Sequence, residues 1–197
     1  MPKQLRMVRP HLDGLPEIEV PVGYAIRTYR EGDDVHWVNV INAAFKETFT
    51  TFDFYEDIGG KPSFSPEGLY FATFQDTPVA TTYARLLVPG ESEMGSVHMV
   101  AVTPDHTGHR LGRSVTLSVL QYFQQRNFKC AILGTDDFRL PAIKTYLNLD
   151  FVPVYIDVDH PERWRKIFPK LGLPVMPDQT NALRCTLSEE LWAKISG

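Results

Sequence analysis

Residues 97–120 read V-H-M-V-A-V-T-P-D-H-T-G-H-R-L-G-R-S-V-T-L-S-V-L, and this stretch decides the fold. Its first six residues are rich in β-branched and apolar side chains and predict a strand, whereas apolar residues at helical spacing predict a helix that ends near Arg126. The loop between them carries Gly108 and Gly112. Amides in the first turn of a helix have no partner within it and lie at the positive end of its dipole. The unit therefore has a geometry that binds phosphate.

Basic side chains surround this loop, although the chain as a whole is acidic. The 197 residues contain 20 Lys+Arg and 24 Asp+Glu, a formal charge of −4, which argues against a nucleic-acid partner. Four cationic or titratable residues nevertheless lie within the loop and the helix start, namely His106, His109, Arg110 and Arg113. They indicate an anion site, and a solvated helix start with incidental basic residues is the alternative.

Outward from this unit, the periodicity predicts an alternation of strands and helices. We expect strands at residues 24–30, 97–102, 129–133, 151–157 and 182–187, a hairpin at 69–87, and helices at 34–45, 111–126, 140–149 and 162–171. Residues 46–68 predict a short helix and a loop. This order indicates a mixed α/β (α+β) layer fold.

The domain organisation follows from length and from proline spacing. Prolines and glycines interrupt residues 1–23, so we expect an N-terminal arm lying over the domain. Residues 24–197 then form a single domain, with a helical and strand extension from about residue 158. The two cysteines, Cys130 and Cys185, are too few for the disulfide framework of a small secreted domain. No signal peptide or membrane-spanning stretch is evident, so we expect a cytoplasmic protein without a membrane partner.

Two motifs resemble the GNAT superfamily of acetyl-CoA-dependent N-acyltransferases. V-T-P-D-H-T-G-H-R-L-G, residues 102–112, is similar to the family's V-x-P-x-x-R-G-x-G-x-G, with Thr107 and Arg110 departing from it. Residues 142–151 are similar to A-x-x-x-Y-x-x-x-G-F, with Tyr146 in register and Asp150 in place of the glycine. The resemblance spans roughly residues 24–157 and implies a mostly antiparallel sheet with splayed central strands and helices on both faces.

The resemblance also implies a site for acetyl-CoA as co-substrate. In this family a bulged central strand binds the pantetheine arm and the following loop binds the pyrophosphate. A polar contact is common after the next strand, where Asp136 and Asp137 also suit turn and cap roles. The cofactor-binding positions that the resemblance implies in this sequence are Val100, Ala101, Val102, Thr107, Gly108, His109, Arg110, Leu111, Gly112, Arg113 and Asp137.

Two residues match the family's proton-transfer positions. Tyr146 corresponds to the tyrosine that donates a proton to the departing thiolate, and a tyrosine that only packs is the alternative. His98 corresponds to a position that carries a water-linked base in some members, and a half-buried structural histidine is the alternative. No cysteine lies near the motifs, which favours direct attack of an amine on the thioester. Cys130 belongs to a buried strand, and His106 with His109 lacks the further ligands that a metal site needs.

The sequence therefore predicts an N-acetyltransferase acting on a primary amine, either a small molecule or a peptide amine. Residues 45–64, acidic and aromatic, lie where this family builds its acceptor pocket, so a cationic amine is one expectation and simple packing of a short helix is the other. A non-catalytic acyl-CoA-binding module is the main alternative, and a Rossmann-type nucleotide binder is a more distant one. The oligomeric state, a homodimer included, stays open.

Overall fold

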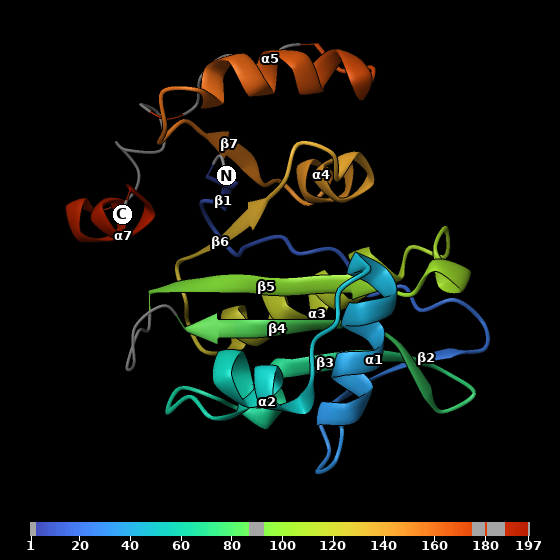
Figure 1. The fold of residues 1–197 in the computed structure, drawn as a ribbon. Helices are drawn as coiled ribbons and strands as arrows, with labels where there is room; N and C mark the ends of the chain where they lie inside the picture. Colours follow the sequence, from blue (N-terminus) through green and yellow to red (C-terminus); the bar gives the residue numbers. More distant parts are fainter. Residues whose placement is uncertain (1–2, 87–92, 175–179, 181–187, 197) are drawn as a thin grey trace.

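One sheet of seven strands organises the part of the chain that the computed structural model describes, residues 3–86, 93–174, 180 and 188–196. Figure 1 shows the strands in the order β2-β3-β4-β5-β6-β1-β7. All neighbouring pairs are antiparallel except β5 and β6, which are parallel. The strands are β1 (Leu5–Arg9), β2 (Tyr24–Thr28), β3 (Leu69–Phe74), β4 (Thr77–Leu86), β5 (Met94–Val102), β6 (Cys130–Thr135) and β7 (Val152–Val154).

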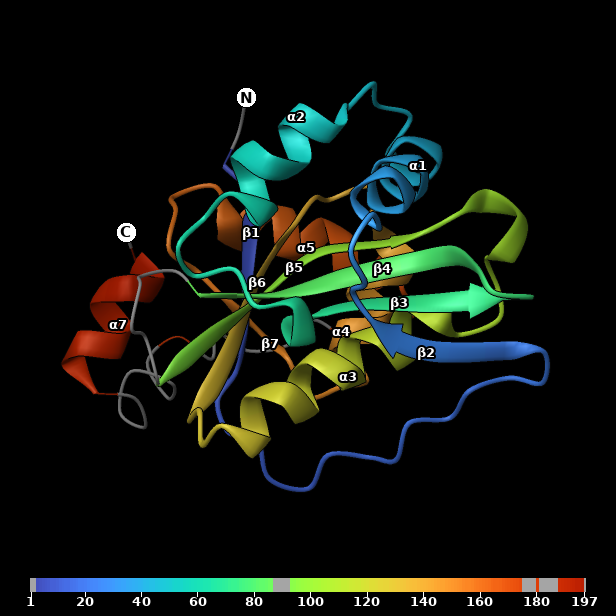
Figure 2. The same cartoon turned by 90° about the horizontal axis from the view of Figure 1, so that it is seen from below.

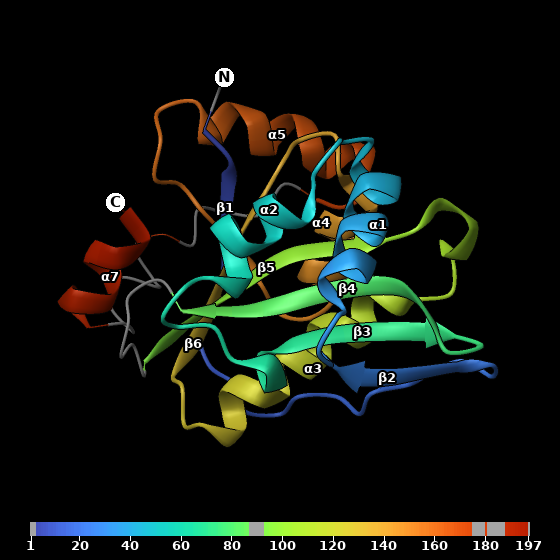
Figure 3. The ribbon, with the colours of Figure 1, turned by 60° about the horizontal axis from the view of Figure 1, so that its bottom comes forward.

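Helices cover both faces of this sheet. One face packs against α1, α2 and the C-terminal α7, and the other packs against α3, α4 and α5. Figure 2 shows α1 and α2 on one side of β3 to β5 and α3 on the opposite side, and Figure 3 shows α1 and α2 lying over the strands. The helices are α1 (Asp34–Phe45), α2 (Thr51–Phe54), α3 (Leu111–Gln125), α4 (Leu140–Leu147), α5 (His160–Lys170) and α7 (Glu189–Ser196), with short π or 3-10 turns η1 (Tyr55–Gly59), η2 (Pro66–Gly68) and η3 (Pro104–His106).

The N-terminal segment corrects the sequence prediction. Residues 1–23 were expected to form an arm over the domain, but Leu5–Arg9 is a strand inserted between β6 and β7. Leu5 and Met7 are fully buried in the core on the α3 side. The remaining part of the arm does run alongside α3 (Figure 2). Ser114 of α3 donates its hydroxyl to the carbonyl of Glu19.

The central strands part in the way that the family resemblance implies. β5 and β6 pair only over Met94–Ser96 and Cys130–Ile132, and beyond that point β6 turns away from β5 (Figure 1). A bulge follows directly, because Met99 and Val100 both lie opposite one residue of β4. Met99 has a φ of 53°, a left-handed conformation that few non-glycine residues adopt. The bulge and the parting strands open a gap in the middle of the sheet.

The other predicted elements are confirmed with small changes of length. The strand at 97–102 begins earlier, at Met94, and the strand at 151–157 is limited to Val152–Val154. Cys130 is completely buried, as expected for a core residue. The strand expected at 182–187 lies outside the described residues. None of the helices in the described ranges is long and apolar enough to cross a membrane.

Candidate active site

A cavity of about 860 Å³ occupies the gap between the parting strands. Its walls come from β5, the loop before α3, the end of β6, α4 and the end of α1, together with Arg85 of β4 and with Gln4 and Arg6 near the N-terminus. Most residues that the sequence analysis assigned to the site line this cavity: His98, Val100, Ala101, Val102, Thr107, Gly108, Arg110, Leu111, Gly112, Arg113 and Tyr146. The two motifs, with 29 residues between them in the sequence, therefore meet in one space.

The loop before α3 forms a cradle for an anion at one end of the cavity. The first intrahelical bond of α3 runs from the amide of Ser114 to the carbonyl of Arg110, so the amides of residues 111–113 have no helical acceptor. Gly108 has a φ of 83°, and a side chain there would meet nothing within 4 Å. The cradle is therefore open, and the positive end of the helix dipole lies against it.

Arg110 occupies the position where the family pattern has a glycine, and its backbone explains why glycine is usual there. Its φ is 57°, which is left-handed and costs about 1–2 kcal/mol in an ordinary L-residue. Its guanidinium lies 3.8 Å from the carboxylate of Glu19, and both side chains are exposed. Arg113 in the first turn of α3 has no acidic partner among the described residues and is free to add a charge-assisted contact.

The edge of β5 that faces the gap supplies backbone groups. The amide of Thr103 bonds to Val79 on the β4 side. Since successive residues of a strand direct their amides to opposite edges, the amides of Val100 and Val102 face the gap. These are the two positions expected to bind an extended ligand arm, and their backbone direction is consistent with that role.

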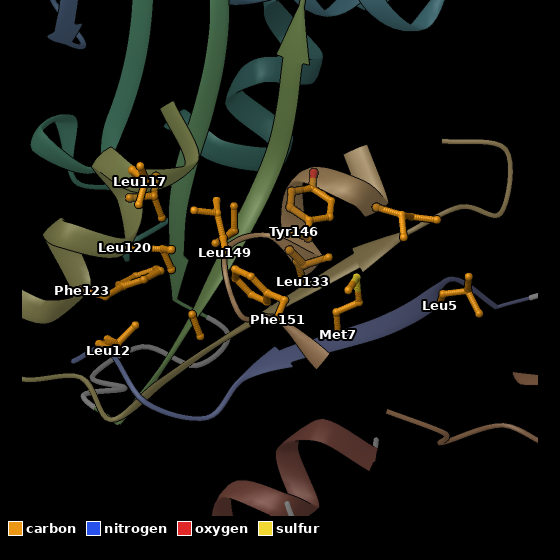
Figure 4. Packing of buried hydrophobic residues seen from close by; sticks show 14 of the residues in the cluster. Leu5, Met7, Leu12, Leu117, Leu120, Phe123, Leu133, Tyr146, Leu149 and Phe151 are labelled. Atoms are coloured by element: carbon orange, nitrogen blue, oxygen red, sulfur yellow. The ribbon is translucent and has the colours of Figure 1, made fainter. Parts of the chain in front are cut away.

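Tyr146 lies on α4 with its ring packed in the core and its hydroxyl at the cavity. The residue is 6% exposed, and its ring contacts Phe151 with centroids 6.0 Å apart. Figure 4 shows the hydroxyl pointing away from the surrounding apolar side chains. Burial raises the pKa of the Tyr146 phenol, so the hydroxyl keeps its proton at neutral pH. A rigid, protonated phenol at this place is suited to donate a hydrogen bond into the cavity.

His98 lies on β5 just before the bulge, on the sheet face covered by α1 and α2. Its Nε2 is 2.8 Å from Oδ2 of Asp57, and Arg85 approaches the same pair, with 3.6 Å between its Nη1 and Oδ1 of Asp57. The hydrogen bond with His98 holds the pKa of the Asp57 carboxyl below its usual range. An ionised Asp57 can accept a hydrogen bond only from a protonated Nε2, so Nδ1 is the ring nitrogen left for a further partner.

Two predicted site residues lie outside the cavity walls. Asp137 forms an ion pair with Arg163 of α5, with a shortest N–O distance of 2.5 Å, and its neighbour Asp136 lines the cavity instead. The ring of His109 packs against Tyr24, with centroids 5.3 Å apart. Both residues therefore connect elements around the site, and of the two aspartates after β6 only Asp136 lines the cavity.

The acidic and aromatic segment after α1 packs more than it lines the cavity. Asp53 is occupied in the cap of α2, where it accepts hydrogen bonds from the amide and hydroxyl of Thr50. Phe54 is completely buried and stacks with its aromatic neighbours. No residue of 46–64 lines the cavity, and the nearest wall residues along the chain are Ala44 and Phe45 at the end of α1. The packing alternative thus accounts for most of these residues.

Several cavity residues were not found from the sequence. Arg139 at the start of α4 stacks on Phe45 at 4.2 Å and forms an ion pair with Asp136 at 2.9 Å, so it bridges two walls. Gln4 and Arg6 reach the cavity from the N-terminal strand. No local motif marks these residues, and only the insertion of β1 into the sheet brings the last two to the site.

Comparison with known proteins agrees with this geometry. The sequence model of the Acetyltransferase (GNAT) family matches residues 34–151. This chain belongs to that family. It is 30% identical over 159 residues to the mycothiol acetyltransferase of Nocardia farcinica and 31% identical over 160 residues to that of Thermomonospora curvata, covering 73% and 78% of this chain. It spans about half the length of these relatives, 50% and 53%.

The fold agrees with solved members of the family. A GCN5-related N-acetyltransferase from Sphaerobacter thermophilus superposes with a TM-score of 0.62 over 77% of this chain and 49% of that one, at 18% sequence identity. At this identity the likeness concerns the fold alone. The parting of β5 and β6, the bulge and the loop before α3 all lie within residues 34–151, which the family model matches.

Proposed function

We propose that this protein transfers the acetyl group of acetyl-CoA to a primary amine by direct attack on the thioester. One observation carries the proposal: the gap between β5 and β6 joins an anion cradle at one end to a buried, protonated Tyr146 within it. Members of the GNAT family use acetyl-CoA as co-substrate. The residues present fit that ligand, because the amides of 111–113, the open Gly108 and Arg113 suit a pyrophosphate.

The proposed roles of the catalytic side chains follow from the two faces of the sheet. A thioester in the gap would present its sulfur to the hydroxyl of Tyr146 on the α4 side, whereas His98 lies on the α1 side. His98 would take a proton from the attacking amine at Nδ1, directly or through water. As the new C–N bond forms and the C–S bond breaks, the electron pair goes to sulfur and Tyr146 gives its proton to the thiolate.

The acceptor that we propose is a small molecule with a primary amine. The relatives at about 30% identity carry the name of an enzyme of mycothiol, a small molecule, which favours this class over a protein amine. The cavity volume of about 860 Å³ is within the range of small-molecule sites.

Thiol release with a panel of amines tests the proposal. We expect Tyr146→Phe to lower kcat by about a hundredfold or more and to leave the dissociation constant for acetyl-CoA unchanged, because the phenol acts on the departing thiolate. Tyr122→Phe is the matched control, since Tyr122 is another buried tyrosine of the same apolar cluster and does not line the cavity.

Three outcomes separate the explanations. No calorimetric binding of acetyl-CoA would refute both an enzyme and a binding module. Binding without turnover of any amine would favour the non-catalytic module. An unchanged rate in Tyr146→Phe would remove the phenol from the mechanism and leave the family assignment intact.

A further inference from the structure

Arg6 is a charged residue of the cavity wall for which bound acetyl-CoA would provide no counter-charge. It lies on β1, opposite Gly134 of β6 and Val154 of β7. Because directly paired residues point to the same face, its side chain shares the face of Gly134. A side chain on Gly134 would meet Nη1 of Arg6 at 3.1 Å and Oε1 of Gln4 at 2.6 Å, so both polar groups lie over the bare backbone of this glycine.

The guanidinium of Arg6 is half-buried and unpaired. Among the residues that the structure describes, no carboxylate lies within 4.0 Å of this guanidinium, and none accepts a hydrogen bond from it. Burial alone lowers the pKa of Arg6, with no opposing acidic group, yet an arginine stays charged at neutral pH. Three other arginines of the cavity wall each have an acidic partner: Arg85 with Asp57, Arg139 with Asp136, and Arg110 with Glu19.

Arg6 is on the opposite side of the sheet from the anion cradle. Val8, two residues along β1 on the same face, packs in the cluster with α7, whereas Leu5 and Met7 pack on the side of α3. The cradle and Arg113 are at the start of α3. A pyrophosphate at the cradle therefore accounts for Arg113 and leaves the charge of Arg6 without a ligand.

His98 lies on the same sheet face as Arg6, on the other side of β6. The last pair of β5 and β6, Ser96 with Ile132, lies two residues before His98 and Gly134, and Gly134 pairs with Arg6 on β1. Neighbouring strands are about 4.8 Å apart, so the Cα atoms of His98 and Arg6 are separated by about 10 Å or more, because β5 and β6 part here. Gly134 contributes no side chain between the two strands, and both His98 and Arg6 line the cavity.

We propose that the acceptor amine also carries a carboxylate and that Arg6 binds it, which makes Arg6 the residue that determines acceptor specificity. A planar guanidinium matches a carboxylate with two parallel hydrogen bonds. Gln4 lies beside Arg6 at the cavity, where its Nε2 donates a hydrogen bond to Oδ1 of Asp136 at 3.4 Å. The amine of such an amino-carboxylate would then lie toward His98. This inference rests on the proposed function, and it replaces the cationic acceptor expected from the acidic segment after α1.

Matched pairs of acceptors test it. Glycine, β-alanine, 4-aminobutyrate and a set of L-amino acids are each compared with their carboxamides, in the thiol-release assay with acetyl-CoA. For the α-amino acids the carboxamide holds more of its amine unprotonated at neutral pH, so intrinsic reactivity favours the amide. We expect the wild type to prefer the best carboxylate over its amide by about tenfold to about a hundredfold in kcat/KM.

Variants of Arg6 assign this preference. We expect Arg6→Gln to remove it, lowering kcat/KM for the carboxylate by about tenfold or more and changing the amide by less than about twofold. Arg6→Lys should keep part of it. Arg165→Gln, which removes one exposed charge from α5, is the control and should change kcat/KM for neither the carboxylate nor its amide. The dissociation constant for acetyl-CoA should be the same in all four proteins.

A binding measurement separates this inference from the proposed reaction. Calorimetry of the same amino-carboxylates with the CoA-bound protein reports anion binding without turnover. Binding that Arg6→Gln abolishes, in a protein that acetylates no amine of either panel, would sustain the carboxylate-binding role of Arg6 and refute the proposed transfer. Equal use of carboxylates and amides by the wild type, equal losses for both in Arg6→Gln, or weaker acetyl-CoA binding in that variant would overturn the inference.

Discussion

Gly95→Ala should destabilise the protein at the point where the central strands separate. Gly95 pairs with Ala131, the middle one of the three parallel pairs before the gap. A methyl group there would lie 2.5 Å from Cδ1 of Phe123 and closer still to two further ring carbons, whereas carbon atoms pack at about 3.5–4.0 Å. Either the strand or the ring must therefore move by about 1 Å. Phe123 has no exposed surface and packs against Tyr122 and Phe128, so the ring has little room.

The expected loss is at the upper end of the range for overpacked cores, about 3 kcal/mol in the free energy of unfolding. Urea unfolding at equilibrium measures it, with the slope used to check two-state behaviour. Gly112→Ala is the control, because a methyl group there has an ordinary contact of 3.7 Å with Val102 and the position is helical. That variant should not lose stability.

A double-mutant cycle shows whether the overlap with the ring is the cause. Phe123→Leu removes volume from the place where the methyl group of Gly95→Ala must go. We expect the double variant to be more stable than the sum of the single changes predicts, by about 1–2 kcal/mol. Additive effects within about 0.5 kcal/mol, or a Gly95→Ala protein as stable as the wild type, would refute the reasoning.

Two further ion pairs give predictions about stability. Burial opposes the charge of Asp33, but hydrogen bonds from Arg27 and the amide of Arg30 hold its pKa below the usual range. Asp33→Asn should cost about 2–3 kcal/mol at pH 7. A lowered pKa of Asp33 stabilises the folded state above about pH 3.9, and this stabilisation is lost as the pH falls through the folded-state pKa. The free energies of unfolding of the wild type and of Asp33→Asn should therefore converge between pH 7 and about pH 2. A difference that stays constant over this range would contradict the prediction. Asp150 has a φ of 59° and pairs with the fully buried Arg9 at 2.9 Å, so Asp150→Ala should be less stable than Asp150→Gly by about 1 kcal/mol in thermal unfolding, and equal stabilities would exclude the backbone cost.

The motifs predicted the part of the site that is local in sequence. The strand, the glycine loop and the first turn of α3 are consecutive, so periodicity and glycine spacing were sufficient to place the cradle and the residues facing it. Tyr146 was assigned through the resemblance to the family's second motif, and the structure places it on α4, the helix that follows β6. The departures in the motifs are also explained locally: Arg110 and Asp150 both take the left-handed conformation that glycine takes more easily.

The part that was missed depends on pairing between distant segments. The sequence of β1 has only five residues with two arginines, which is a weak strand pattern by itself. It becomes a strand because β6 and β7 offer it two edges to pair with. Arg6 reaches the cavity only through this insertion. Asp57 likewise meets His98 across 41 positions, and no spacing rule connects a π-helical turn with a particular strand residue.

The two faces of the sheet divide the proposed chemistry. On a strand, adjacent residues point to opposite faces, so the side chains of His98 and Val97 are separated by the sheet itself, and Val97 belongs to the cluster that contains Tyr146. The gap between β5 and β6 is therefore the place where a group held on one face can react with a group held on the other. In the proposed reaction the amine loses its proton to His98 on one side while the thiolate gains one from Tyr146 on the other. The acid and the base then need not exchange protons with each other during the transfer, and each can be tuned by its own surroundings: an apolar core that keeps the phenol protonated, and a carboxylate, Asp57, that fixes the imidazole tautomer.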